Sequence, residues 1–118
     1  MKLTEKQQLV LNELRKIGRR NAYLYRETEP HLHQQDCEKL LAGDQACVFS
    51  LGGLSFQVGN QLGASAASVL SIFKALQRKG MVIREESHPD YLRARYWWPT
   101  GLAEELSQEL SLVQEVQP

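Results

Sequence analysis

The stretch Ser55-Phe-Gln-Val-Gly-Asn-Gln-Leu-Gly-Ala-Ser-Ala-Ala-Ser-Val-Leu-Ser-Ile-Phe-Lys-Ala-Leu-Gln-Arg-Lys-Gly80 decides the fold of this 118-residue chain. Val58 and Leu62 are four positions apart, so they share one face of a short first helix, which Gly63 is placed to end. Ser65 is a good N-cap for a second helix. The apolar face of that second helix consists of Val69, Ile72, Phe73 and Leu76. Two helices joined by a short glycine-containing turn are typical of a helix-turn-helix.

The residues that follow predict a β-hairpin. Gly80 ends the second helix, and Met81–Glu86 and Leu92–Trp98 then read as two strands joined by the turn-forming loop Ser87–Tyr91. Within the first helix, Gly59 leaves room for another helix to cross closely. A helix-turn-helix at about 55–80 followed by a hairpin at about 81–98 is the arrangement of a winged helix, whose hairpin is the wing.

At these positions the chain resembles the MarR-like winged-helix transcriptional regulators. The resemblance covers about residues 55–101 and 3–18. Its matching features are the Leu62-Gly63 turn, the helix exit Leu76–Val82, and the wing run Asp90–Ala94 leading to Pro99–Gly101. Asp90 lies one residue further from Arg93 than is usual in that family, and Pro99 replaces a leucine. The resemblance implies a winged-helix fold, DNA binding and dimerisation through the terminal helices.

Length and composition indicate one domain covering residues 1–118. No apolar run approaches the roughly 20 residues that span a bilayer. The N-terminus lacks the apolar core of a signal peptide, and two cysteines suit a reducing compartment. We therefore expect a cytoplasmic protein without a membrane partner.

The net charge of zero hides alternating zones. Residues 1–26 carry a net charge of +5 and residues 55–99 one of +3, whereas 27–54 and 100–118 carry −4 each. Phosphates respond to a local patch and not to the total charge, so the basic zones favour a nucleic-acid partner.

The N-terminal residues predict a helix that starts with a Thr4–Gln7 capping box and ends at Gly18. Its apolar stripe consists of Val10, Leu14 and Ile17, with Leu11 beside it. Arg15, Lys16, Arg19 and Arg20 gather at its C-terminal end. There they either complement the helix dipole or contact phosphates, and both readings stay open.

Between this helix and residue 55 we expect an irregular connection over 21–30, a short helix and a short strand. The helix starts at Pro30, turns Leu32, Cys37, Leu40 and Leu41 inward, and ends at Gly43-Asp44. Ala46–Leu51 would be a third strand beside the wing hairpin.

Two kinds of chemistry are weighed and set aside. His31, His33, Cys37 and Cys47 are metal-ligand types, but they lack a tight Cys-x-x-Cys or His-x-x-x-His pair, so we expect no metal. A thiol redox switch stays an alternative for either cysteine. No catalytic motif is present, and His88 in a turn has no pocket to shift its pKa, so we expect neither an enzyme nor a cofactor.

Residues 100–116 predict a C-terminal helix whose apolar stripe is Leu102, Leu106, Leu110 and Val113. The stripe could cover the chain's own core or pair with a second copy. We expect the second, because most soluble oligomers are two-fold dimers and MarR-like proteins dimerise through terminal helices.

The sequence therefore predicts an α+β, mainly helical winged helix that binds duplex DNA as a homodimer and regulates transcription, most simply as a repressor. The second helix would present Ser65, Ala66, Ala67, Ser71 and Lys74 to the major groove. Phosphate contacts would come from Arg78 and Lys79. The wing would add Arg93 and Arg95, exposed on one face with Trp97, while Leu92, Ala94, Tyr96 and Trp98 pack inward on the other. The two alanines offer base edges no hydrogen bonds. A winged helix that binds a protein partner, with Leu70 as a contact, is the alternative.

Overall fold

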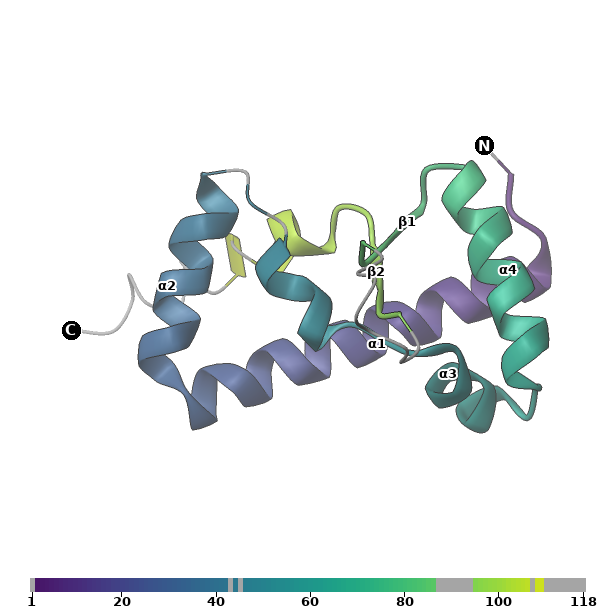
Figure 1. Cartoon of the computed structure of the whole chain (residues 1–118), viewed down its shortest axis with the longest axis horizontal. Helices are drawn as coiled ribbons and strands as arrows, with labels where there is room; N and C mark the ends of the chain where they lie inside the picture. The colour runs from purple at the N-terminus through teal and green to yellow at the C-terminus, as the bar shows by residue number, and fades with distance from the viewer. Residues whose placement is uncertain (1, 43, 45, 87–94, 107, 110–118) are drawn as a thin grey trace.

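One long helix, α1 (Glu5–Thr28), runs through the molecule, and the other named helices pack against it. A computed structural model describes residues 2–42, 44, 46–86, 95–106 and 108–109. The further elements are the helices α2 (Pro30–Leu41), α3 (Ser55–Leu62) and α4 (Ala66–Arg78), the 3-10 helix η1 (Ala46–Leu51), and the strands β1 (Val82–Arg84) and β2 (Trp97–Pro99). Helical backbone returns at 102–106 and 108–109. Figure 1 shows α3 and α4 at the N-terminal end of α1 and α2 at its other end. The fold is thus mainly helical with a small two-stranded antiparallel sheet.

The start of α1 is confirmed, but its predicted end is wrong. Thr4 Oγ1 accepts the Gln7 N–H at 3.1 Å, and Gln7 Oε1 accepts the Thr4 N–H at 3.1 Å. The helix does not stop at Gly18 and continues through residues 21–28, where we expected irregular chain. Gly18 serves packing instead. A Cβ atom there would lie 2.7 Å from Leu102 Cδ2 and 3.0 Å from Trp98 Cζ3.

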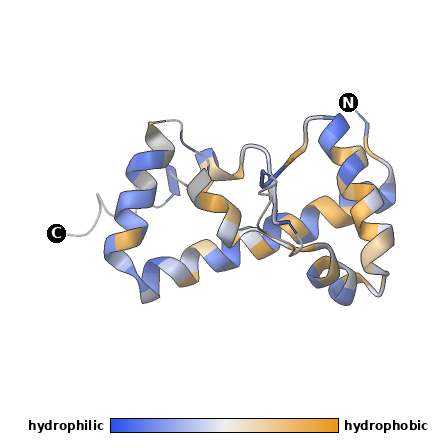
Figure 2. Cartoon of the chain, viewed as in Figure 1, coloured by the Kyte–Doolittle hydropathy of each residue, from blue (hydrophilic) through white to orange (hydrophobic). Residues whose placement is uncertain are grey.

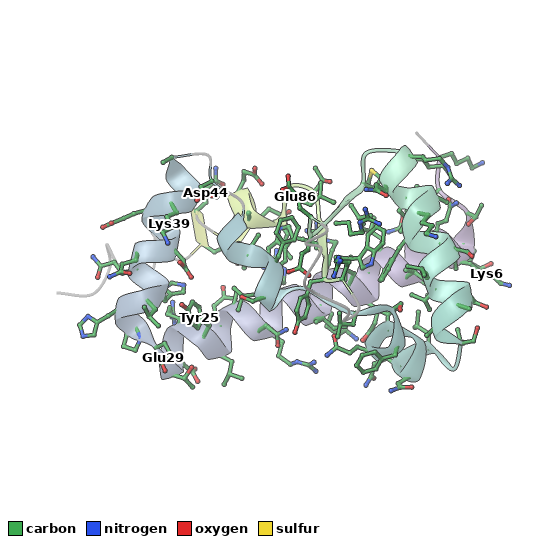
Figure 3. The ribbon with its side chains drawn as sticks, viewed as in Figure 1. Lys6, Tyr25, Glu29, Lys39, Asp44 and Glu86 are labelled. Carbon is green, nitrogen blue, oxygen red and sulfur yellow. The ribbon has the colours of Figure 1, made fainter. Side chains whose placement is uncertain are left out.

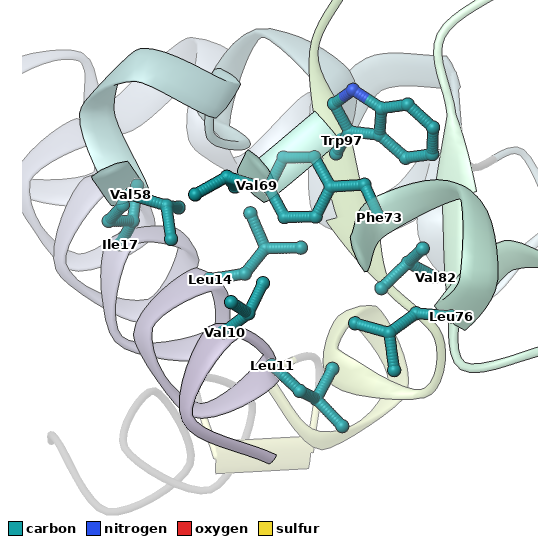
Figure 4. Packing of buried hydrophobic residues seen from close by; sticks show 10 residues of the cluster. All are labelled: Val10, Leu11, Leu14, Ile17, Val58, Val69, Phe73, Leu76, Val82 and Trp97. Atoms are coloured by element: carbon teal, nitrogen blue, oxygen red, sulfur yellow. The ribbon is translucent and has the colours of Figure 1, made fainter. Parts of the chain in front are cut away.

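The first hydrophobic core lies between α1, α3 and α4. Its buried residues are Val10, Leu11, Leu14, Ile17, Val58, Val69, Phe73, Leu76, Val82 and Trp97, as Figure 4 shows. The Phe73 and Trp97 ring centroids are 5.0 Å apart. Both apolar stripes predicted for the helices are therefore confirmed, with Ile72 only partly buried at the edge. This core holds α4 packed against α1 in a fixed orientation.

A second core is formed by Ala22, Val48, Trp98, Leu102, Ala103 and Leu106. Trp97 and Trp98 follow each other in β2 and point to opposite faces, so each anchors a different core. The sequence placed Trp97 on an outer face with the arginines, and this was wrong because β2 is covered on both sides.

The sheet is smaller than predicted. Val82, Ile83 and Arg84 pair with Pro99, Trp98 and Trp97 respectively. Ala46–Leu51 is a 3-10 helix and not a strand. Among the described residues, one isolated β-bridge joins the segment after this helix to β2: the Gly53 N–H donates to the Trp97 carbonyl at 3.0 Å, and the Trp97 N–H donates to the Gly53 carbonyl at 2.9 Å. Residues 87–94, which include Asp90, Leu92, Arg93 and Ala94, lie outside the described residues.

Helix α2 is confirmed from Pro30, but Leu32 does not face inward as predicted. Leu32 is 47% exposed, whereas its neighbour His33 is buried. The His33 ring stands edge-on to Tyr25 at 6.2 Å and so takes the place against α1. Figure 2 shows that α2 is largely hydrophilic. Gly43 and the side chains of Cys37, Leu40, Leu41 and Cys47 lie outside the described part.

The two described residues of the C-terminal stripe belong to the chain's own core. Leu102 is 0% and Leu106 3% exposed within the single chain. These two residues are therefore not an open dimerisation stripe, contrary to our expectation. Leu110 and Val113 lie beyond the described residues. Among the described helices, none is both long and apolar enough to cross a membrane.

Candidate nucleic-acid interface

The turn between α3 and α4 is built by two glycines. Gly63 ends α3 in the left-handed region, at φ 69° and ψ 31°, a conformation that costs glycine little. The Ala64 N–H then donates to the Gly59 carbonyl at 2.9 Å. A Cβ atom at Gly59 would lie 2.5 Å from the Ala64 carbonyl oxygen. Gly59 thus makes room for the turn itself, and not for a separate crossing helix as we expected.

Ser65 caps α4. Its Oγ accepts the Ser68 N–H at 3.1 Å and donates to Ser68 Oγ at 2.8 Å. The hydroxyl predicted to read a base edge is therefore used within the protein. What the N-terminus of α4 presents to solvent is the positive end of the helix dipole and the two exposed methyl groups of Ala66 and Ala67.

Helix α4 has one sealed face and one open face. Val69, Phe73 and Leu76 are each 0% exposed. The opposite stripe is exposed at every position and consists of Ala67, Ser71, Lys74 and Arg78. Their spacing of four, three and four residues places them on one side of the helix. Leu70 is only partly exposed and packs on the first core, so it does not belong to this open face.

This part of the chain carries positive charge without any acidic residue. No Asp or Glu occurs from Gln45 to Arg84, whereas Lys74, Arg78, Lys79 and Arg84 all lie in that run. Lys6 lies at the same end of the molecule as α4, and Lys39 on α2 lies at the far end, as Figure 3 shows. The acid-free run was visible in the sequence and is the signal that our zone-by-zone charge count missed.

Lys79 contributes less to the open face than we expected. It is half-buried, and its Nζ donates to Gln7 Oε1 at 2.8 Å and to the Lys2 carbonyl at 3.4 Å. The ammonium group therefore ties the end of α4 to the start of α1. These partners are more than 70 positions apart in the chain, so local patterns could not indicate them.

The basic residues of the hairpin are divided. Arg95 is half-buried, which is contrary to its expected exposure, and Arg93 lies outside the described residues. Arg84 on β1 is exposed, and its guanidinium carbon stands 6.0 Å above the Trp97 ring. Arg84 was not predicted as a DNA contact, because we interpreted its strand only as one side of the hairpin.

The basic cluster predicted at the end of the first helix lies in the middle of α1 and is dispersed. Arg15 pairs with Glu105, Arg19 with Glu105 and Glu109, and Lys16 with Glu13 at 3.7 Å. Carboxylates already compensate these three side chains, so a joint phosphate contact is not supported. Arg20 points to the other side, toward α3.

The described residues contain no group of three His, Cys, Asp or Glu side chains that could hold a metal ion. No protein-family model, curated protein or solved structure matches the chain. Its function must therefore be inferred from its own residues. Among the described residues, the open face of α4 is the best-defined candidate site.

Proposed function

We propose that this protein is a winged-helix regulator of transcription that binds duplex DNA through α4. The observation that carries the proposal is the open face of α4, which is exposed, basic and free of acidic residues. The 13 residues of α4 form a helix about 20 Å long. One face of α4 is buried in the core and the opposite face is exposed. Such a helix is suited to enter the major groove.

The proposed contacts follow from side-chain chemistry. Lys74 and Arg78 pair with phosphates or guanine edges, and Ser71 bonds a base edge. Ala66 and Ala67 pack against thymine methyl groups. Arg84 and the hairpin arginines Arg93 and Arg95 reach the flanking backbone. The proposed role is binding, and it involves neither catalysis nor a cofactor.

We further propose that the protein acts as a homodimer. One α4 reads a single half-site, and a two-fold dimer places two such helices about one DNA turn apart. Because Leu102 and Leu106 belong to the core, the interface would use other residues, and Leu110 and Val113 remain candidates for it. Sedimentation of the full chain tests this part separately from DNA binding.

The DNA experiment is a titration of mixed-sequence duplex followed by fluorescence anisotropy over a salt series. The affinity should fall steeply as salt rises, because phosphate contacts release counterions. Lys74→Ala and Arg78→Ala should each weaken binding, and each lost phosphate contact should lower the salt slope by about one. Lys39→Ala removes the same charge from α2 and is the matched control. No binding of the wild type at low salt would exclude the proposal.

A protein-binding module is the second candidate, and one observation favours it. Phe56 is 49% and Leu62 37% exposed on α3, and Ala66 and Ala67 are exposed at the start of α4. Together they would offer an apolar contact to a partner. The double variant Phe56→Ser, Leu62→Ser separates the two candidates. If this variant binds DNA with the affinity of the wild type, the result supports the regulator. If the wild type itself does not bind DNA, the result supports the protein-binding module.

A further inference from the structure

A polar pocket lies between α1 and α3, and none of its lining residues belongs to α4. Its volume is about 230 Å³, and it is lined by Ile17, Arg20 and Asn21 from α1 and by Gln57, Asn60 and Gln61 from α3. On both helices the positions follow the spacing i, i+3, i+4, so two helix faces meet across the pocket. None of these lining residues is acidic.

Two of the carboxamides are held in place by the backbone. Asn21 Nδ2 donates to the Leu51 carbonyl at 2.9 Å. Gln57 Oε1 accepts the Leu54 N–H at 2.9 Å as part of the start of α3. These bonds orient both side chains and leave the Gln57 amide nitrogen as a hydrogen-bond donor. The donor is thus oriented before any ligand arrives.

Arg20 supplies the charge of the pocket. Arg15 and Arg19, on the other side of α1, are compensated by Glu105 and Glu109. For Arg20, no carboxylate of the described residues is within ion-pair distance. A guanidinium group presents its donors as a planar fork that matches an oxyanion. The pocket therefore combines one uncompensated cation with a fixed amide donor.

We propose that this pocket binds a small oxyanion: a phosphate or carboxylate, free or carried by a small molecule. Arg20 holds two of its oxygens, the Gln57 amide donates to it, and Ile17 contacts any attached carbon. Since a water molecule takes up about 30 Å³, the volume fits an oxyanion with a few further atoms. The site is independent of the proposed DNA contact, because it uses other helix faces.

The test is a titration of the full chain with inorganic phosphate and, separately, with acetate, at constant ionic strength balanced by chloride. Backbone amide shifts around α1 and α3 in NMR spectra are the readout. Saturable shifts are expected with at least one probe, and that probe identifies the class of oxyanion. Arg20→Met should weaken binding about tenfold or more. Arg20→Lys, which keeps the charge and loses the fork, should recover only part.

Lys39→Met is the matched control, because it removes an exposed cation from α2 and should leave the titration unchanged. Shifts that do not saturate, or that are equally weakened in Lys39→Met, would reduce the effect to general surface association and overturn the proposal. A loss of DNA affinity in Arg20→Met, with neither probe binding the wild type, would assign the pocket to the DNA contact and also overturn it. Unchanged melting temperatures ensure that both variants are folded.

Discussion

Arg19 on α1 donates from Nη1 to both carboxylate oxygens of Glu109, each at 2.8 Å. Tyr23, one turn further along α1, donates its hydroxyl to the same carboxylate at 3.0 Å. One turn before, Arg15 pairs with Glu105, which also lies 3.4 Å from Arg19 Nη2. Arg15, Arg19 and Tyr23, spaced by four on α1, thus bind Glu105 and Glu109, which are also spaced by four. We call these five residues the ladder. This ladder closes the polar edge of the second core.

The ladder predicts a pH dependence at the acid end. The hydrogen bond from Arg19 lowers the pKa of Glu109 below its ordinary value of 4.5. A carboxyl whose folded-state pKa is depressed contributes stability above its unfolded pKa and loses it as the pH falls. The attachment of residues 105–109 should therefore weaken below about pH 4.5. Because the pair is partly exposed, the effect should be modest.

Melting temperatures of the wild type and of Glu109→Gln, measured between about pH 7 and about pH 3, check this expectation. The variant should lose part of the acid-dependent decrease. Glu27→Gln, an exposed glutamate of α1 outside the ladder, is the control and should follow the wild type. Identical pH profiles for all three proteins would mean that the ladder does not stabilise the fold.

His33 predicts a second, milder pH dependence. Burial first, and the nearby Arg26 second, lower its pKa from 6.5, while Asp36 opposes the shift. The unfolded chain then binds a proton more readily than the folded one, so stability decreases as the pH falls below about 6.5. The docking of α2 on α1 should weaken in that window. The control is His31, which is exposed on the same helix.

Thermal unfolding between about pH 8 and about pH 5.5 is the measurement. His33→Gln should flatten the profile, and His31→Gln should keep the wild-type profile. If His31→Gln also flattens it, the dependence does not come from the buried ring.

The turn between α3 and α4 offers a contrast of two glycines. In Gly59→Ala the new methyl group would lie 2.5 Å from the Ala64 carbonyl oxygen, a backbone atom that cannot easily move aside. We expect about 1–3 kcal/mol of destabilisation from overpacking. In Gly63→Ala the space is open, and only the positive φ is strained, at about 1–2 kcal/mol. Denaturant unfolding measures both, and stability equal to the wild type in Gly59→Ala would contradict the observed close approach.

Local signals account for what the sequence predicted well. The Ser65 cap, the left-handed Gly63 and the apolar stripe of α4 act within a few residues, so the helix bounds and the open face could be derived from spacing alone. The errors come from distant contacts. Gly18 was read as a helix end, although it is small because Leu102 and Trp98 pack on it. Both tryptophans of β2 are buried, and alternation alone would have exposed one of them.

The site residues divide in the same way. Ala67, Ser71, Lys74 and Arg78 lie on the open face of α4, as their helical spacing predicted, and Ala66 is exposed at the start of the helix. Lys79 was assigned to phosphate contacts, and for Arg15 and Arg19 such contacts were one of two open readings, but their partners are 72 to 90 positions away in the chain. Charge patterns in a sequence cannot indicate which cations the fold itself compensates.

Leu102 decides between a core and a dimer interface for the C-terminal stripe. It is 0% exposed and contacts the Gly18 region of α1. Leu102→Ala should therefore lower the free energy of unfolding by about 2–5 kcal/mol, through lost burial and the cavity that remains. Leu9→Ala, at a position on α1 that is 51% exposed, should change the free energy of unfolding by less than about 0.5 kcal/mol.

For a core residue the loss of stability is the same at every protein concentration, whereas a loss at a dimer interface depends on concentration by mass action. Denaturant unfolding of both variants over a wide concentration range, with sedimentation of the wild type alongside, makes the distinction. A loss in Leu102→Ala that appears only with dissociation would return this residue to an interface.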